Sequence, residues 1–385
     1  MNSSMSRAFQ SFIKLKYRAS SQLSSQLSSQ LSSQLSRSLV SQAFHCQEEW
    51  NARLASPIFQ KIKLGEFFVD LDKKFSTEYK ASAVDVDIFA QAAATPADCE
   101  QLEELLHKLR RTPHTIFSPP STNHAAIRAL LRAEEHPEGG DQVHHIVKML
   151  DDRMNYGLFL DDYTAILLLD YMLENKRLLE GARVASQLMF QEESRAGPGA
   201  ALANLATWRY CREARDEPWF YDTEIPEDEN PDEVIRVRVK GMVPNNYNDE
   251  HFDLRDGKHI LGKTLAYLNI SDDDLSKSLR CLGLILCDKA DSVKSLGHFT
   301  ISEEVLEIAQ EIVTSDNIKE HLSTLPTEAN NVDDVLLKVC QESLAASENT
   351  IIDNQKKMYD EWSSSRDKML GKYLISQSEM CFKNI

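Results

Sequence analysis

Apolar side chains recur at helical spacing through the centre of the chain, and the clearest pattern lies between residues 156 and 189. A Tyr-Gly-Leu-Phe-Leu-Asp segment at 156–161 leads into an apolar helix that should end at Glu174. After the polar turn 175–177, a second helix carries apolar residues at Leu178, Leu179, Ala182, Val184, Ala185, Leu188 and Met189. One such hairpin cannot bury its own apolar face, so the pattern predicts neighbours stacked on both sides.

The chain aligns with itself at an offset of about 38 residues. This offset places Ile127, Leu130 and Leu131 over Ala165, Leu168 and Leu169, and it predicts a partner helix over 143–150. An upstream hairpin has apolar residues Val84, Val86, Ile88 and Phe89 in its first helix and Leu102, Leu105, Leu106 and Leu109 in its second. The period is typical of two-helix repeats of the tetratricopeptide or pentatricopeptide type.

The central hairpin resembles a pentatricopeptide repeat. Gly157 and Asp161 match the linker of that family, Thr164 matches its helix start, and Ala182 and Met189 match the pair seven residues apart in its second helix. The order of elements is similar to that of the pentatricopeptide-repeat proteins of the mitochondrial small ribosomal subunit. This wider resemblance is carried by Trp50-x-x-Arg53, Asp72-Lys73-x-Phe75, Arg110-x-x-Pro113, the block 156–169 and Tyr359-x-x-Trp362.

The resemblance implies a structural constituent of that subunit, in the mitochondrial matrix, which contacts ribosomal RNA and adjacent small-subunit ribosomal proteins and supports translation. A free RNA-processing or mRNA-specific translation factor could be built on the same repeats. Free base-reading proteins need many repeats to reach specificity, and about three are recognisable here. The repeat number therefore favours the ribosomal interpretation.

Residues 1–47 differ in composition from the rest of the chain. They contain no Asp or Glu, and positive charge comes from Arg7, Lys14, Lys16, Arg18 and Arg37 among many Ser. This composition is typical of a mitochondrial transit peptide, although repeated Ser-Ser-Gln-Leu units also fit a disordered tail. Removing five cations and no anions would change the formal charge from −17 to −22.

A chain this acidic cannot coat RNA with its whole surface, because nonspecific RNA binding depends on Lys and Arg that displace counterions from phosphate. RNA contact is therefore expected at a local basic strip, and protein partners should carry much of the docking. The candidates lie at hairpin ends and on the helix that follows: Lys108, Arg110, Arg111, His114, Arg128 and Arg132. Solvated helix faces are the alternative interpretation of these positions.

A base-reading code is not expected. In base-reading pentatricopeptide proteins, a small polar residue on the first helix of each repeat contacts a base edge together with the residue before the next repeat. The aligned positions here hold Ile166, which cannot hydrogen-bond, and Arg128, whose planar fork suits phosphate. Asp161 matches the linker position but could equally cap the following helix.

One motif suggests an enzyme. Residues 257–264, Gly-Lys-His-Ile-Leu-Gly-Lys-Thr, match the phosphate-binding loop pattern, and the apolar run 284–288 ends in Asp. The preceding segment 249–256 is charged rather than strand-like, and the run 284–288 lies within a helical pattern, so nucleotide hydrolysis is disfavoured. No nucleophile motif appears, the histidines between 107 and 145 lack ligand spacing, and seven Cys without a CxxC pair indicate reduced thiols. We expect no catalytic residue, no cofactor and no metal.

Beyond the repeats, the periodicity predicts helices over 200–211, 251–268 and 272–287, the last capped by Ser271. A Thr300-x-x-Glu303 capping box should open a helix through Val313, and residues 234–240 suggest a short strand. The last 40 residues read as one long helix, which could dock on the C-terminal helical region or project as an arm.

Together these features predict an all-α fold. Residues 1–47 form the transit segment and 48–193 a helical-hairpin solenoid of pentatricopeptide-type repeats. Residues 194–250 form a helix and an acidic irregular loop, 251–347 a helical C-terminal region, and 348–385 the long terminal helix. No apolar run approaches the roughly 20 residues that span a bilayer, so no membrane association is expected.

Overall fold

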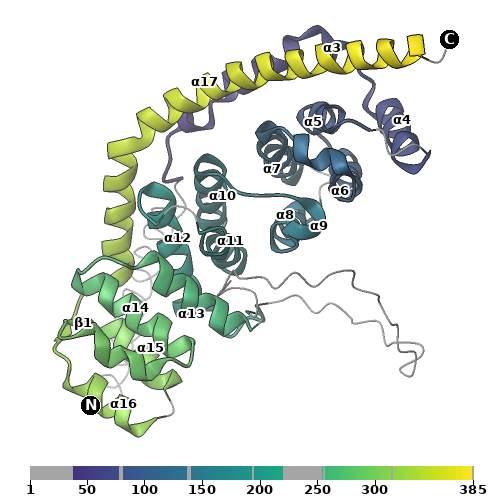
Figure 1. Ribbon diagram of the computed structural model, residues 1–385. Coiled ribbons are helices and arrows are strands. Elements are labelled where there is room, and N and C mark those ends of the chain that lie inside the picture. The colour runs from purple at the N-terminus through teal and green to yellow at the C-terminus, as the bar shows by residue number, and fades with distance from the viewer. Residues whose placement is uncertain are drawn as a thin grey trace, which may run out of the picture.

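The computed structural model describes residues 38–77, 81–136, 140–192, 195–219, 254, 256–313 and 315–383, with side chains excepted at 77 and from 372 onward. Helices dominate these residues, which confirms the all-α expectation (Figure 1). Within the described ranges the one sheet is a two-residue parallel pair, β1 (Ile301–Ser302) with β2 (Thr327–Glu328). Among the helices described, none is both long and apolar enough to cross a bilayer.

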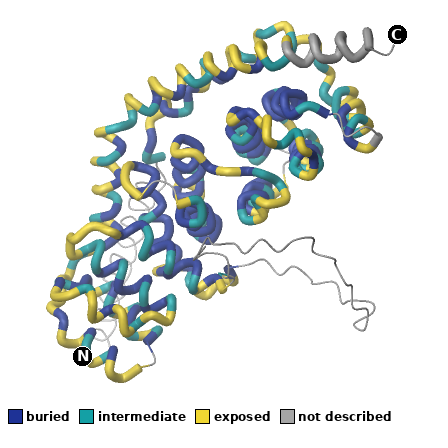
Figure 2. The backbone as a smooth tube through the Cα atoms, viewed as in Figure 1, coloured by how far each residue is buried: buried dark blue, intermediate teal, exposed yellow. Residues whose placement is uncertain are grey.

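The three predicted hairpins are present as stacked helix pairs. They are α5 (Ala83–Ala92) with α6 (Pro96–Arg110), α7 (Pro120–Glu134) with α8 (Gln142–Asp151), and α10 (Asp162–Glu174) with α11 (Leu178–Phe190). The short α9 (Arg153–Tyr156) leads into the linker before α10, and α12 (Pro198–Arg209) continues into the π-helical turn η4 (Tyr210–Ala214). Figure 2 shows buried residues concentrated in the helices of this stack.

Local chemistry explains where these helices begin and how closely they pack. Asp161 caps α10, because its carboxylate accepts the amide of Thr164 at 2.7 Å while the Thr164 hydroxyl accepts the amide of Asp161 at 3.0 Å. Gly181 lies where α11 meets its neighbours: a Cβ there would lie 3.4 Å from the Cβ of Met172 and 3.5 Å from that of Ala206, which is ordinary van der Waals contact. Helix α11 therefore contacts both α10 and α12 at Gly181.

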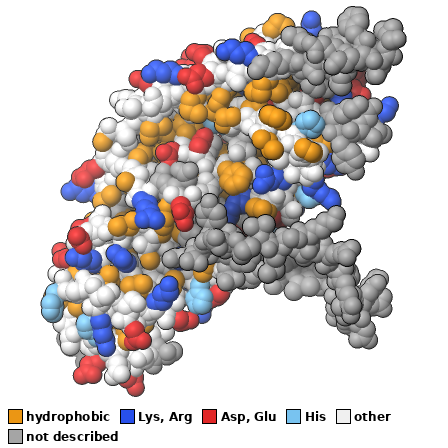
Figure 3. Space-filling model, in the orientation of Figure 1, with side chains coloured by type: hydrophobic (Ala, Val, Ile, Leu, Met, Phe, Trp, Pro, Cys, Tyr) orange, Lys and Arg blue, Asp and Glu red, His pale blue; other side chains and the backbone are white. Residues whose placement is uncertain are grey.

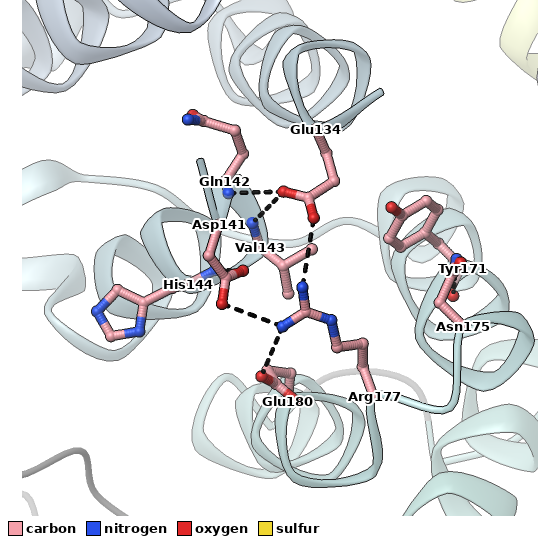
Figure 4. A network of polar contacts seen from close by, with 9 residues as sticks. All are labelled: Glu134, Asp141, Gln142, Val143, His144, Tyr171, Asn175, Arg177 and Glu180. Atoms are coloured by element: carbon pink, nitrogen blue, oxygen red, sulfur yellow. Dashed lines mark hydrogen bonds and ion pairs between the residues drawn. The ribbon is translucent and has the colours of Figure 1, made fainter. Parts of the chain in front are cut away.

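An arginine bridge joins successive hairpins (Figure 4). Arg177, in the turn between α10 and α11, contacts carboxylate oxygens of Glu134 at 3.3 Å, Asp141 at 3.1 Å and Glu180 at 3.3 Å. Glu134 also accepts the amide of Gln142 at 2.6 Å, so the end of α7 caps the start of α8. One side chain thus fixes the third hairpin against the second.

The segment before the repeats consists of short helices. These are η1 (Gln42–His45), α2 (Gln47–Ala52), η2 (Arg53–Ala55), α3 (Pro57–Lys61) and the longer α4 (Leu64–Thr77). The turn between α6 and α7 contains η3 (Pro113–Phe117).

The C-terminal region contains α13 (Gly257–Leu268), α14 (Asp274–Leu286), η5 (Ala290–Leu296), α15 (Glu303–Ile312) and α16 (Asp316–Thr324). Two predicted helix starts are wrong. The cap of α14 is Asp273 rather than Ser271, because its carboxylate accepts the amide of Ser276 at 3.0 Å. Thr300 opens no capping box: Ile301 donates its amide to the carbonyl of Pro326, so the chain there is extended and α15 begins after Ser302.

The last helix, α17 (Val332–Lys383), begins earlier than the predicted residue 348. It packs on α12 and then along η1, α2 and α5 (Figure 1). The helix therefore docks within its own chain, but mainly on α12, on the segment before the repeats and on α5 rather than on the predicted C-terminal helical region. The acidic loop beyond residue 219, the suggested strand 234–240 and the proposed transit segment up to residue 37 lie outside the described residues.

Candidate nucleic-acid interface

The N-terminal segment covers the first helices of the repeats. Asp170 of α10 accepts the amide of Leu39 at 2.7 Å and the hydroxyl of Ser38 at 2.8 Å. Tyr163, also on α10, donates its hydroxyl to the carbonyl of Phe44 at 2.6 Å. Arg53 donates to the carbonyl of Gln91 on α5 at 2.8 Å. Residues 38–53 therefore lie along α5 and α10 where the first helices would otherwise be open.

The long helix α17 covers these first helices further along. Arg366 donates through Nε to a carboxylate oxygen of Asp87 on α5 at 3.0 Å, and both side chains are buried. Tyr359 places its hydroxyl 3.1 Å from Nε2 of His124 on α7. The His124 ring also lies 5.1 Å from Trp50 and 5.2 Å from Trp362, measured between centroids. Histidine and aromatic rings thus join α2, α7 and α17.

The positions that would read bases are therefore occupied by the chain itself. Ile166 is fully buried, and Asp161 is engaged as the cap of α10. Arg128 donates to the carbonyl of His45 at 2.8 Å, to Gln47 at 2.9 Å and to the hydroxyl of Tyr359 at 3.2 Å. These contacts give Arg128 an internal structural role, and RNA contact by this residue stays a prediction.

The electrostatics of the ring cluster favour a neutral histidine. Burial lowers the pKa of His124 well below its ordinary value, and the nearby charges of Arg128 and Arg53 lower it further. Burial and Arg128 also lower the pKa of His45. The Nε2 of a neutral His124 can accept a hydrogen bond from the Tyr359 hydroxyl. The oxygen of that hydroxyl accepts a hydrogen bond from Arg128.

Arg132 lies beside a cavity of mixed charge. This cavity, of about 320 Å³, lies between the N-terminal segment and the first helices, and its lining includes Arg128, Arg132, Glu135 and Glu174. Arg132 itself is exposed. The two glutamates oppose phosphate binding inside the cavity, which leaves the outer surface of Arg132 as its accessible part.

The other four candidates gather at the turn from α6 to α7. Lys108 pairs with Asp72 and Glu104, and Arg110 donates through Nε to the carbonyl of Met154 at 3.1 Å. Arg111 is exposed and His114 is half-buried. Figure 3 shows acidic and basic side chains interspersed over the face in view, so any positive site is local. Arg111 is the most accessible cation of this turn, and RNA contact by all six candidates remains a prediction.

Exposed apolar side chains lie in and beside this turn, and the helical periodicity of the sequence does not indicate them. Ile116 is 82% exposed, Phe117 66%, Met154 72% and Phe159 37%. Phe159 lines a cleft of about 190 Å³ between the α6–α7 turn and the linker before α10. Ile116 and Phe117 could have been noticed as large apolar residues between prolines in a turn, because such a turn cannot bury them.

The residues of the phosphate-loop motif form the helix α13 from Gly257 to Leu268, so their amides face along a helix instead of wrapping a phosphate. Both glycines have packing reasons. A Cβ at Gly262 would lie 2.5 Å from the carbonyl oxygen of Gly283 on α14, and a Cβ at Gly257 would lie 2.2 Å from the Cβ of Trp219. The crossing of α13 and α14 therefore explains Gly262, and the close approach of Trp219 explains Gly257. Within the described ranges, no group of His, Cys, Asp and Glu is arranged to hold a metal ion.

The family described as mitochondrial 28S ribosomal protein S27 matches residues 9–380, which is nearly the whole chain.

Proposed function

Because the chain belongs to the mitochondrial 28S ribosomal protein S27 family, we propose that it is a non-catalytic structural constituent that contacts ribosomal RNA and neighbouring ribosomal proteins and thereby supports translation. Membership of this family makes it a protein of the mitochondrial small ribosomal subunit, located in the mitochondrial matrix. The contacts and the contribution to translation are the proposed part.

The coverage of the first helices is the observation that carries the RNA proposal. Ile166 is buried, and Arg128 is held by the N-terminal segment and α17. RNA is therefore contacted through phosphate and shape at the open α6–α7 turn, where Arg111 is exposed, with Arg110, Lys108 and His114 beside it. Arg132 extends the positive surface elsewhere on α7. The net charge of −17 confines RNA to such local sites and leaves the rest of the surface to proteins.

The alternative, a free RNA-processing or mRNA-specific translation factor, needs open first helices that read bases. Coverage of those helices by residues 38–53 and by α17 argues against this function. Import would depend on the acid-free segment 1–47, whose composition suits a transit peptide. Because residues 38–47 pack on the repeats, a cleaved peptide would end before Ser38.

Sedimentation of mitochondrial lysate tests the ribosomal proposal. We expect the chain to comigrate with the small subunit in gradients at moderate salt. A slow-sedimenting free pool without comigration would contradict this proposal and favour the alternative.

Binding assays with the purified chain test the phosphate contact. Arg111→Ala should weaken binding by a similar factor for RNAs of permuted sequence and should flatten the salt dependence, because one phosphate contact is lost. Lys294→Ala, an exposed cation on η5, is the matched control and should change neither quantity. A loss that depended on RNA sequence would instead indicate base reading.

A further inference from the structure

The cleft beside the α6–α7 turn has two unlike walls. One wall comes from the α6–α7 turn and the start of α7 and carries Thr115, Ser118 and Asn123. The other comes from the linker before α10 and carries Tyr156 and Phe159, with Arg110 between the walls. In the part of the chain that the structure describes, the side chains of Thr115, Ser118 and Asn123 have no hydrogen-bond partner. The cleft therefore presents free polar groups opposite aromatic rings.

The walls are held in place before any ligand arrives. Pro113, Pro119 and Pro120 restrict the turn, because each fixes its own φ. Arg110 is fixed by its hydrogen bond to the carbonyl of Met154. Its side chain packs closely on Gly157, because a Cβ there would lie 3.2 Å from the Cδ of Arg110. The Tyr156 hydroxyl donates to Glu103 at 3.0 Å, which anchors that ring. A preformed cleft loses little conformational entropy on binding.

These features suit a flat, polar, aromatic ligand. An unpaired base in RNA is recognised by stacking on aromatic side chains and by hydrogen bonds to its edges. Phe159 offers a partly exposed ring, Asn123 offers an amide that can both donate and accept, and Arg111 on the adjoining surface can hold the phosphate. An aliphatic side chain of a protein partner would leave the polar wall unsatisfied, which costs free energy.

We infer that this cleft binds one unpaired RNA base, stacked on Phe159, with its phosphate near Arg111. The inference rests on the proposed function, because it names the class of RNA that the turn contacts: a bulged or looped nucleotide rather than a continuous duplex. Stacking tolerates every base, so selectivity is for the unpaired state and only weakly for sequence. The site lies where the α6–α7 turn meets the start of α7 and the linker before α10.

Fluorescence titration of the full chain tests the inference. The probes are a short RNA hairpin with one bulged 2-aminopurine and the same hairpin with that nucleotide paired. We expect the bulged RNA to bind about tenfold more tightly, since stacking contributes roughly that factor, and to lose fluorescence on binding. Phe159→Leu should reduce the ratio of the two affinities to about one, and Phe159→Tyr should preserve it.

Two controls separate the cleft from general RNA binding. Met154→Leu changes an exposed apolar side chain outside the cleft lining and should leave the ratio unchanged. Arg111→Ala should weaken both RNAs alike. A ratio near one in the parent chain, with Arg111→Ala still weakening both, would overturn the base-binding cleft and leave the proposed phosphate contact standing.

Crosslinking in the assembled subunit gives an independent readout. A photoreactive phenylalanine analogue in place of Phe159 should crosslink to ribosomal RNA in purified small subunits. Crosslinks to a neighbouring protein alone would overturn the inference and assign the cleft to protein docking. The proposed function is tested separately, by sedimentation, and it would be contradicted if the chain were absent from the small-subunit fractions.

Discussion

At the residue scale, Gly157 lies in the linker before α10 and packs closely against the side chain of Arg110. Its φ of +70° lies in the left-handed region, and an added Cβ would lie 3.2 Å from Arg110 Cδ. Gly157→Ala should therefore lower the free energy of unfolding by about 1–2 kcal/mol, measured by chemical denaturation. The control is Gly65→Ala on α4, where a Cβ meets nothing within 4 Å; it should be neutral or stabilising by up to about 1 kcal/mol. Equal effects at both glycines would refute this explanation.

His124 should make stability depend on pH. Its pKa in the folded chain lies well below the ordinary 6.5, because it is buried and lies near Arg128 and Arg53. In the window between these two values the unfolded chain binds more protons, so the free energy of unfolding should fall as pH drops below 6.5. Urea denaturation of His124→Gln should show a shallower decline with acid than the parent. Some decline should remain from His45, whose pKa is also lowered by burial and by Arg128. An unchanged slope in the variant would contradict the assignment to His124.

The sequence identified these residues without showing that they meet. Trp50 and Tyr359 belong to separate fragments of the family resemblance in the sequence, and their rings lie 5.6 Å apart in the fold. Periodicity reports which face of a helix is apolar, but it carries no information on which distant segment covers that face. Arg128 illustrates the consequence: its charge suited phosphate, whereas its partners come from elements far away in the sequence, such as Tyr359.

At the element scale, helices with long apolar repeats were predictable and short or irregular elements were not. The hairpin α10–α11 followed from spacing and from the linker 157–161, because both are local signals. The β1–β2 pair is two residues long on each strand, too short for an alternating pattern, and its pairing overrode the apparent capping box at Thr300. Asp273 and Ser271 are both good caps, so the prediction of Ser271 was wrong for lack of a local signal that separates the two residues.

The ion pair between α5 and α17 should be essential to the docking of the long helix. Asp87 is fully buried and also accepts the hydroxyl of Ser121, so removing Arg366 leaves a buried carboxylate without its counter-charge. Arg366→Met should cost about 3–5 kcal/mol and should increase hydrogen exchange in the C-terminal half of α17. Lys338→Ala, which breaks an exposed pair with Glu342 on the same helix, should cost well under 1 kcal/mol. If the two variants were equally stable, the buried pair would not hold the helix.

At the scale of the whole molecule, the repeat stack is covered by two segments far apart in the sequence, 38–53 and 332–366. The family and the all-α class followed from sequence, because repeats and linker motifs are local. The covered first helices did not, since they depend on contacts between segments 38–53, 83–174 and 332–366. From Asp333, paired with Arg209 at 2.8 Å, to Arg366, paired with Asp87, α17 spans roughly 50 Å at 1.5 Å per residue. One helix therefore connects α12 with α5 across the stack.

This bracing predicts how the molecule responds to truncation. Ending the chain after Ser347 retains the contacts of Asp333, Leu336 and Leu344 but removes Tyr359, Trp362 and Arg366. The first hairpins should then lose protection against hydrogen exchange, while α13 and α14, which cross at Gly262 and Gly283, keep theirs. Ending the chain after Gly371 removes none of these contacts and is the matched control. RNA binding by the shorter chain should still show no sequence preference, because Ile166 on the first helix of its repeat cannot hydrogen-bond to a base. If the first hairpins and the α13–α14 pair lost protection against hydrogen exchange equally, α17 would stabilise the whole fold and not the repeats in particular.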